Sequence, residues 1–137
     1  MFKKTITYTD YNGVSRTEDF YFNLNKAELT KLQLGYPGGY EQYVRRCLDA
    51  EDVPALLKIF EELIDLSYGE KDDSGKRFIK NQQLTESFKQ TEAYSEMFVD
   101  FLTNQNSAEE FFIKIMPVDI QNSLLSQAVE RSAVNEQ

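Results

Sequence analysis

The dipeptide Asn12-Gly13, set between two runs of alternating apolar and polar residues, constrains this chain more than any other feature. Asn-Gly in such a setting is a strong signal for a β-hairpin, because both residues tolerate the backbone conformations of tight turns. The alternation has the period of strands that are buried on one side. The sequence therefore predicts a hairpin over residues 2–22, with these apolar residues: Phe2, Ile6, Tyr8, Val14, Phe20 and Phe22.

The length of the loop decides which side chains share a face of this hairpin. A two-residue loop at Asn12-Gly13 sends the apolar residues of the two strands to opposite faces, because one step of register flips every side chain. A three-residue loop over residues 11–13 places Phe2 opposite Phe22 and gathers all the apolar residues on one face. It also favours a glycine in the left-handed region, where Gly13 stands. We therefore predict the three-residue loop.

Two helices are predicted directly after the hairpin. Asn25, with Glu28 three residues later, has the spacing of a capping box and opens a first helix that ends near Gly35. The run Pro37-Gly38-Gly39 does not continue a helix and forms the connection. It lacks the lysine and hydroxyl residue of a phosphate-binding loop. A second helix spans roughly residues 40–49.

A third helix has the strongest periodicity in the chain. Asp52 caps it, and Pro54 stands in the first turn, where its missing N–H is tolerated. Apolar residues then recur with a helical period until Gly69 ends the helix. Residues 70–76 are predicted to be a charged loop that contains a turn at Ser74-Gly75.

The next part of the chain is also helical. Apolar spacing predicts a fourth helix around Phe88 and a fifth over residues 94–102, and it leaves open whether the two are continuous. Ser107 with Glu110 has the spacing of another capping box and opens a short helix that Pro117 interrupts.

Together these elements predict an α+β fold, an N-terminal β-hairpin followed by a mainly α-helical bundle of about five or six helices. Residues 1–117 are expected to form a single domain, and residues 118–137 an amphipathic helix or a flexible tail. The apolar stripe of this last segment either docks in a groove on a partner or packs on its own domain. We take it as the candidate protein-binding element, formed by Ile120, Leu124, Leu125, Ala128 and Val129.

Composition narrows the range of partners. The 137 residues carry a net charge of −8, and an acidic surface repels phosphate backbones and anionic lipid heads. We therefore expect neither nucleic acid nor a membrane as the main partner. One cysteine forms no internal disulfide and suits the cytosol. The sequence shows neither a signal peptide nor an apolar run of the ~20 residues that span a bilayer, so we expect a soluble protein.

Familiar catalytic and metal-binding constellations are missing. Without histidine there is no Ser-His-Asp or Cys-His pair and no Cys₂His₂ zinc site, and one cysteine makes no thiolate site. Asp72-Asp73 lacks the ligand spacing of an EF-hand. Glu61, Glu62 and Asp65 fall on the polar face of the third helix, and Cys47 falls on an apolar face. We predict no enzyme activity, no cofactor and no metal.

Four segments carry a resemblance: TITYTDYNGVSRTEDFYFNLNKAEL at residues 5–29, SYGEKDDSGKRFIKN at 67–81, TEAYSEMF at 91–98 and AEEFFIKIMP at 108–117. Their order and spacing resemble the tail assembly chaperones of long-tailed, siphovirus-type bacteriophages of Gram-positive hosts. The resemblance covers roughly residues 5–117. In the second segment it rests on Tyr68, Gly69, Gly75, Phe78 and Lys80.

The resemblance implies a protein without catalytic activity that works in the cytoplasm of the infected host. Such chaperones bind the tape measure protein, keep it soluble and help to recruit tail tube subunits around it. They often self-associate, and they are not expected in the mature virion. Two alternatives remain: a structural tail or connector component that is retained in the virion, and a small phage regulatory protein that binds a host factor.

Overall fold

The N-terminal hairpin has the predicted register. In the computed structural model, which describes residues 1–118 and 121–122, β1 (Phe2–Thr9) pairs antiparallel with β2 (Ser15–Phe22). Phe2 lies opposite Phe22. Beyond the strands, the Asp10 N–H donates to the Val14 C=O at 2.9 Å, and Gly13 has a φ of 80°. The three-residue loop and the shared apolar face are therefore confirmed.

A second hairpin was missed by the sequence prediction. Residues 70–76 were expected to be a loop, but their flanks form β3 (Tyr68–Lys71) and β4 (Phe78–Ile79). Only the turn at Ser74-Gly75 was correctly placed, and Gly75 has a φ of 75°. Strand β3 also pairs with β2, which gives a four-stranded antiparallel sheet in the order β1-β2-β3-β4. Strands this short lack the alternation that identifies longer ones.

The first three helices begin and end close to their predicted bounds. They are α1 (Lys26–Leu34), α2 (Tyr40–Asp49) and α3 (Val53–Ser67). Asn25 and Glu28 form the full capping box, because each side chain accepts a hydrogen bond from the backbone N–H of the other residue. Asp52 caps α3 by accepting from the Ala55 N–H at 3.2 Å.

The next three helices correct one prediction and settle an open one. They are α4 (Gln82–Lys89), α5 (Glu92–Thr103) and α6 (Gln105–Lys114). Helices α4 and α5 are separate, because Thr91 caps a new helix. The predicted cap at Ser107 is wrong. Asn104 ends α5 and also caps α6, accepting from the Asn106 N–H at 3.1 Å, so α6 begins two residues before Ser107.

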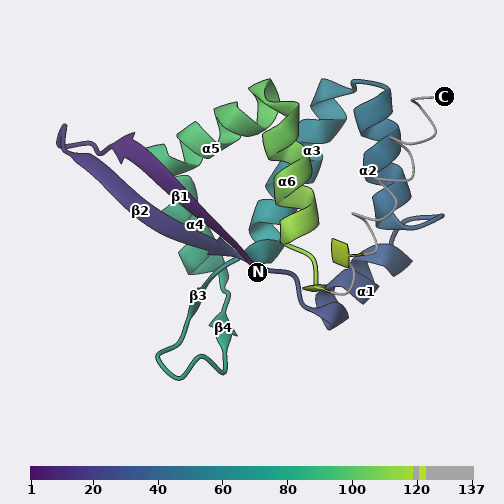
Figure 1. Cartoon of the computed structure of the whole chain (residues 1–137), viewed down its shortest axis with the longest axis horizontal. Coiled ribbons are helices and arrows are strands. Elements are labelled where there is room, and N and C mark those ends of the chain that lie inside the picture. Colours follow the sequence, from purple (N-terminus) through teal and green to yellow (C-terminus); the bar gives the residue numbers. More distant parts are fainter. Residues whose placement is uncertain (119–120, 123–137) are drawn as a thin grey trace.

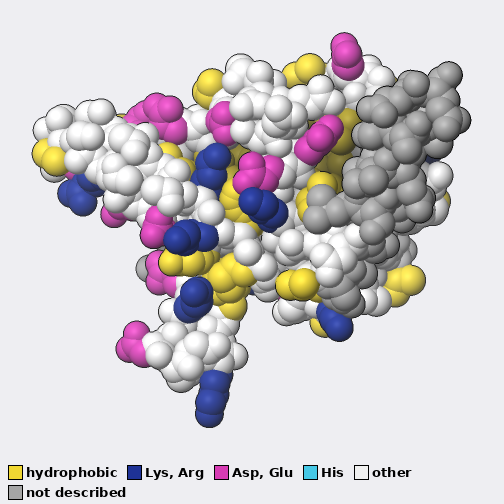
Figure 2. Space-filling model, viewed as in Figure 1, with side chains coloured by type: hydrophobic (Ala, Val, Ile, Leu, Met, Phe, Trp, Pro, Cys, Tyr) yellow, Lys and Arg dark blue, Asp and Glu magenta, His cyan; other side chains and the backbone are white. Residues whose placement is uncertain are grey.

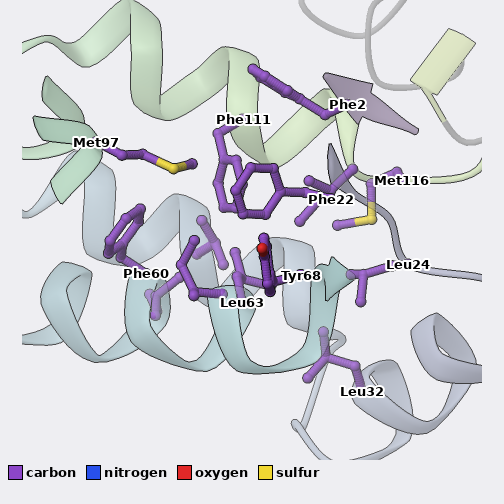
Figure 3. Close-up of a cluster of buried hydrophobic side chains, with 14 of the residues drawn as sticks. Phe2, Phe22, Leu24, Leu32, Phe60, Leu63, Tyr68, Met97, Phe111 and Met116 are labelled. Carbon is purple, nitrogen blue, oxygen red and sulfur yellow. The ribbon is translucent and has the colours of Figure 1, made fainter. Parts of the chain in front are cut away.

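Aromatic side chains from distant parts of the chain meet in the core (Figure 3). The Phe22 and Phe111 ring centroids are 5.5 Å apart, and Phe60 lies 5.9 Å from Phe111. Tyr68 stacks on Phe88 at 4.4 Å. Each such ring contributes about 1.5–3 kcal/mol by burial, so these contacts hold the sheet against the helices. The described part of the chain therefore has the predicted α+β fold. It consists of a sheet that contains the N-terminal hairpin and of six helices (Figure 1).

Candidate protein-binding surfaces

The acidic residues considered for chemistry take part in local structure. On α3, the Asp65 carboxylate pairs with Lys89 Nζ at 2.5 Å, and Glu62 accepts from the Tyr36 hydroxyl at 3.1 Å. Cys47 is buried, as predicted. No group of three histidine, cysteine or acidic side chains among the described residues is arranged to hold a metal ion. In the same residues, no helix is long and apolar enough to cross a membrane.

Asp72 organises the turn of the second hairpin. Its carboxylate accepts from the Ser74 hydroxyl at 2.9 Å and from Arg77 Nε at 3.1 Å. These two contacts, with Ser74 first, hold the pKa of Asp72 below its ordinary value. Both carboxylate oxygens of Asp72 therefore accept hydrogen bonds within their own turn, which agrees with the prediction of a turn in this loop.

A cavity of about 500 Å³ at the base of the second hairpin is lined in part by the half-buried Lys80. Lys80 Nζ donates to the Asn23 C=O at 2.6 Å, to the Leu66 C=O at 2.8 Å and to the Glu28 carboxylate at 2.6 Å. An ammonium group has three donors, and all three are in use. Lys80 therefore links β4 to α1 and to the end of α3, and it is not available to a ligand.

Close packing between β3 and β4 explains why position 69 is a glycine. A Cβ there would lie 2.6 Å from the Ile79 C=O and 2.8 Å from the Phe78 ring. Only the missing side chain lets β3 and β4 approach at this point. Gly69, Phe78 and Lys80 belong to the second segment of the resemblance, so that segment encodes the closure of the second hairpin.

The described surface also has a groove with exposed apolar residues, a cavity of about 310 Å³ between the start of α3 and the end of α5. Val53 and Leu102 flank it and are 52% and 39% exposed. Figure 2 shows hydrophobic side chains reaching the surface among acidic ones on the helical part of the molecule. We call this cavity between α3 and α5 the α3–α5 groove. Its lining residues are Leu48, Glu51, Val53, Leu56, Phe101, Leu102, Thr103, Gln105 and Ala108.

The helix ends at Asp52 and Asn104 determine where the two walls of the α3–α5 groove lie. The cap at Asp52 and Pro54 start α3 directly after a turn, which leaves Val53 with solvent on one side. On the other wall, α5 ends at Asn104, so Leu102 lies in the last turn of the helix and is partly exposed. The sequence identified these apolar residues as parts of helices. It did not bring them together, because the two walls are about fifty positions apart in the chain.

The candidate element predicted from the sequence lies elsewhere. All of its residues fall outside the part of the chain that the structure describes: Ile120, Leu124, Leu125, Ala128 and Val129. That hypothesis therefore stays a prediction.

Comparison with known proteins agrees with the resemblance. No curated protein and no solved structure matches the chain. The family model described as phage tail assembly chaperone matches residues 1–137, which is the whole sequence. The match extends the resemblance beyond residues 5–117 to both ends of the chain. The chain belongs to the phage tail assembly chaperone family.

Proposed function

We propose that this chain binds the tape measure protein of a siphovirus-type phage, keeps it soluble during tail assembly and helps to recruit tail tube subunits. The family is non-enzymatic, and a tail assembly chaperone has tail proteins as partners. The proposed place of action is the cytoplasm of the infected host. The proposal includes the absence of the protein from the mature virion and a Gram-positive host.

The observation that supports this function best is the α3–α5 groove on an acidic protein. A long helical partner exposes apolar stripes before assembly, and an apolar stripe binds in grooves of this kind through residues spaced three and four apart. Val53 and Leu102 offer exposed apolar surface on the two walls of the groove. The net charge of −8 adds solubility to the complex.

The C-terminal stripe of Ile120, Leu124, Leu125, Ala128 and Val129 is proposed as a second contact. Its spacing is that of one apolar helix face, which suits either the tape measure protein or a further copy of the chain. Self-association in many copies would let a small domain cover a long partner.

Co-expression with the tape measure protein of the same phage tests the function. We expect the chain to move the tape measure protein into the soluble fraction. Leu102→Glu places a charge on the groove wall and should abolish this effect. Leu34→Glu is the matched control, because Leu34 is an 83% exposed leucine on α1. If the wild-type chain leaves the tape measure protein insoluble, the proposed function is wrong.

Two further measurements separate the parts of the proposal. A chain that ends after Pro117 should solubilise less well, and equal performance would remove only the C-terminal stripe. Mass spectrometry of purified virions should not find the chain. Its presence in stoichiometric amounts would favour a structural tail component instead.

A further inference from the structure

The two hairpins diverge from a common base and leave a fork in the sheet. Strands β2 and β3 pair only at Tyr21 with Gly69 and at Phe22 with Tyr68. Beyond these pairs, β1–β2 and β3–β4 point in different directions (Figure 1). A cavity of about 430 Å³ lies at the fork, lined by Glu18, Asp19, Phe20, Tyr21, Tyr68, Gly69, Glu70 and Lys71.

The register shows which backbone groups face this fork. On the β3 side of β2, the Asn23 N–H donates to the Ser67 C=O at 2.8 Å, so odd-numbered residues of β2 direct their N–H and C=O toward β3. Thr17 and Asp19 share this direction but lie beyond the end of the β2–β3 pairing. Within residues 1–118, no backbone group pairs with them on that side. The fork therefore holds an open strand edge, which is a template for another extended segment.

Acidic side chains surround this open edge. Glu18 and Glu70 lie on the same side as Tyr68, and after burial itself their charges contribute to the raised pKa of the Tyr68 hydroxyl. Asp19 stands on the opposite side of the strand, where its carboxylate accepts from the Thr5 hydroxyl at 2.6 Å. Lys71 is the one cation of the lining, and its ammonium group already lies over the Tyr21 ring at 4.8 Å from the centroid.

We propose that the fork edge of β2 accepts an extended, lysine- or arginine-bearing segment of a partner protein as an added β-strand. The segment would take the place beside Thr17 and Asp19 that a longer β3 would occupy. Its backbone would bond to the open N–H and C=O groups, and its cationic side chains would pair with Glu18 and Glu70. This surface is distinct from the α3–α5 groove, so its test is independent of tape measure binding.

The outer edge of β1 has the wrong charge for such a partner. Strand β1 carries Lys3 and Lys4 and no acidic residue. Lys4 also pairs with Asp100 on α5, with 3.5 Å between Nζ and the carboxylate. Charge complementarity therefore directs a cationic segment to β2 and away from β1.

Thr7 and Thr17 provide a matched pair of variants. They lie opposite each other, and their hydroxyl oxygens are 2.9 Å apart, so Thr7→Pro and Thr17→Pro lose the same side-chain contact. Neither N–H bonds across the β1–β2 ladder. Proline at position 17 removes a donor from the fork edge, whereas proline at position 7 removes one from the outer edge of β1.

The probe is an acetylated peptide that alternates lysine and valine over seven residues, titrated by fluorescence anisotropy. We expect binding to the wild-type chain, a loss of about tenfold or more in affinity for Thr17→Pro, and a change below about twofold for Thr7→Pro. The double variant Glu18→Gln, Glu70→Gln should also weaken binding. A glutamate–valine peptide should not bind. Amide exchange in the wild-type complex should slow at Thr17 and Asp19.

Several results would overturn the proposal. No binding of the lysine peptide to the wild-type chain would do so, as would equal losses in both proline variants. A larger loss in Thr7→Pro would assign the strand addition to β1. Self-association of the protein alone that Thr17→Pro abolishes would assign the fork edge to a second copy of this chain. If either proline variant unfolds, the glutamine variant and the amide exchange of the wild-type complex decide the question.

Discussion

The two hairpins are built around similar Asp-to-Gly turns, although the loop of the second is one residue longer. In the first, the Gly13 N–H donates to the Asp10 C=O at 3.0 Å, and in the second the Gly75 N–H donates to the Asp72 C=O at 3.0 Å. Both glycines have positive φ, 80° and 75°. Each aspartate also accepts from the Nε of an arginine in the second strand or just before it: Arg16 at 2.6 Å and Arg77 at 3.1 Å.

What differs is the way each hairpin is attached to the rest of the protein. The first has two eight-residue strands and inserts its own apolar residues, such as Phe2 and Phe22, into the core. The second has strands of four and two residues. It depends on the close approach at Gly69 and on the three hydrogen-bonded partners of the half-buried Lys80. A turn of the same kind can therefore be supported by long strands or by single anchoring residues.

The largest expected effect is the loss of the Lys80 anchor. Lys80→Met leaves the partly buried Glu28 carboxylate and two backbone carbonyls without their cationic partner, which should cost about 3 kcal/mol of unfolding free energy. Denaturant unfolding measures this loss. The matched control is Lys89→Met, because the pair of Lys89 with Asp65 is more exposed and should contribute less than about 1 kcal/mol. Equal losses in the two variants would contradict the anchoring role of Lys80.

A smaller loss of stability is expected when alanine replaces the hairpin glycines, and its size should separate a steric requirement for glycine from a backbone-conformation requirement. Gly69→Ala should cost about 2 kcal/mol, because the added Cβ meets the Ile79 C=O and the Phe78 ring. Gly13→Ala and Gly75→Ala meet no atom within 4 Å, and only their positive φ penalises them, by about 1 kcal/mol each. Thermal unfolding ranks the three. If Gly69→Ala is the mildest, the steric account of the second hairpin is wrong.

The same contrast explains what the sequence could predict of the fold. The first hairpin was predicted to the correct register, because six apolar residues admit one shared face and Gly13 suits one loop. The second was missed, because β4 has two residues and Gly69 also matches a helix end. Its strands are held by contacts with β2 and by the bonds of Lys80 to Asn23 and Glu28, and these partners are far away in the chain.

The smallest expected effect concerns the two turn carboxylates. The Arg16 contact is the main cause that lowers the pKa of Asp10, whereas for Asp72 the Ser74 hydroxyl comes before Arg77. Arg16→Gln should therefore raise the pKa of Asp10 more than Arg77→Gln raises that of Asp72. Carboxyl carbon NMR during a pH titration measures both shifts. Equal shifts would mean that the arginine contributes equally to the pKa of the aspartate in both turns.

The lowered pKa values of Asp10 and Asp72 also predict how the stability of the two turns changes with pH. A carboxyl group with a lower pKa in the folded state stabilises the fold at pH values above about 4. This contribution is lost as the pH falls through the lowered value. Both turns should therefore loosen on acidification, seen as faster amide exchange at Gly13 and Gly75. In Asp10→Asn and Asp72→Asn the same amides should lose this pH dependence.

The candidate binding surfaces were less accessible to sequence reasoning than the fold. Val53 and Leu102 looked like ordinary residues of helical stripes, and only the chain path shows that they flank one groove. The open edge at Thr17 depends on where β3 leaves β2, which no local pattern encodes. The family, in contrast, was recognisable from four segments, and two residues of the second one, Gly69 and Lys80, prove to close the second hairpin.

The most direct test of the proposed function uses two purified proteins. The tape measure protein is diluted from denaturant into buffer that contains increasing amounts of this chain, and light scattering is followed. We expect scattering to fall as the molar ratio rises, and we expect Leu102→Glu to be less effective than Leu34→Glu. Scattering that is the same with and without the wild-type chain would contradict the account.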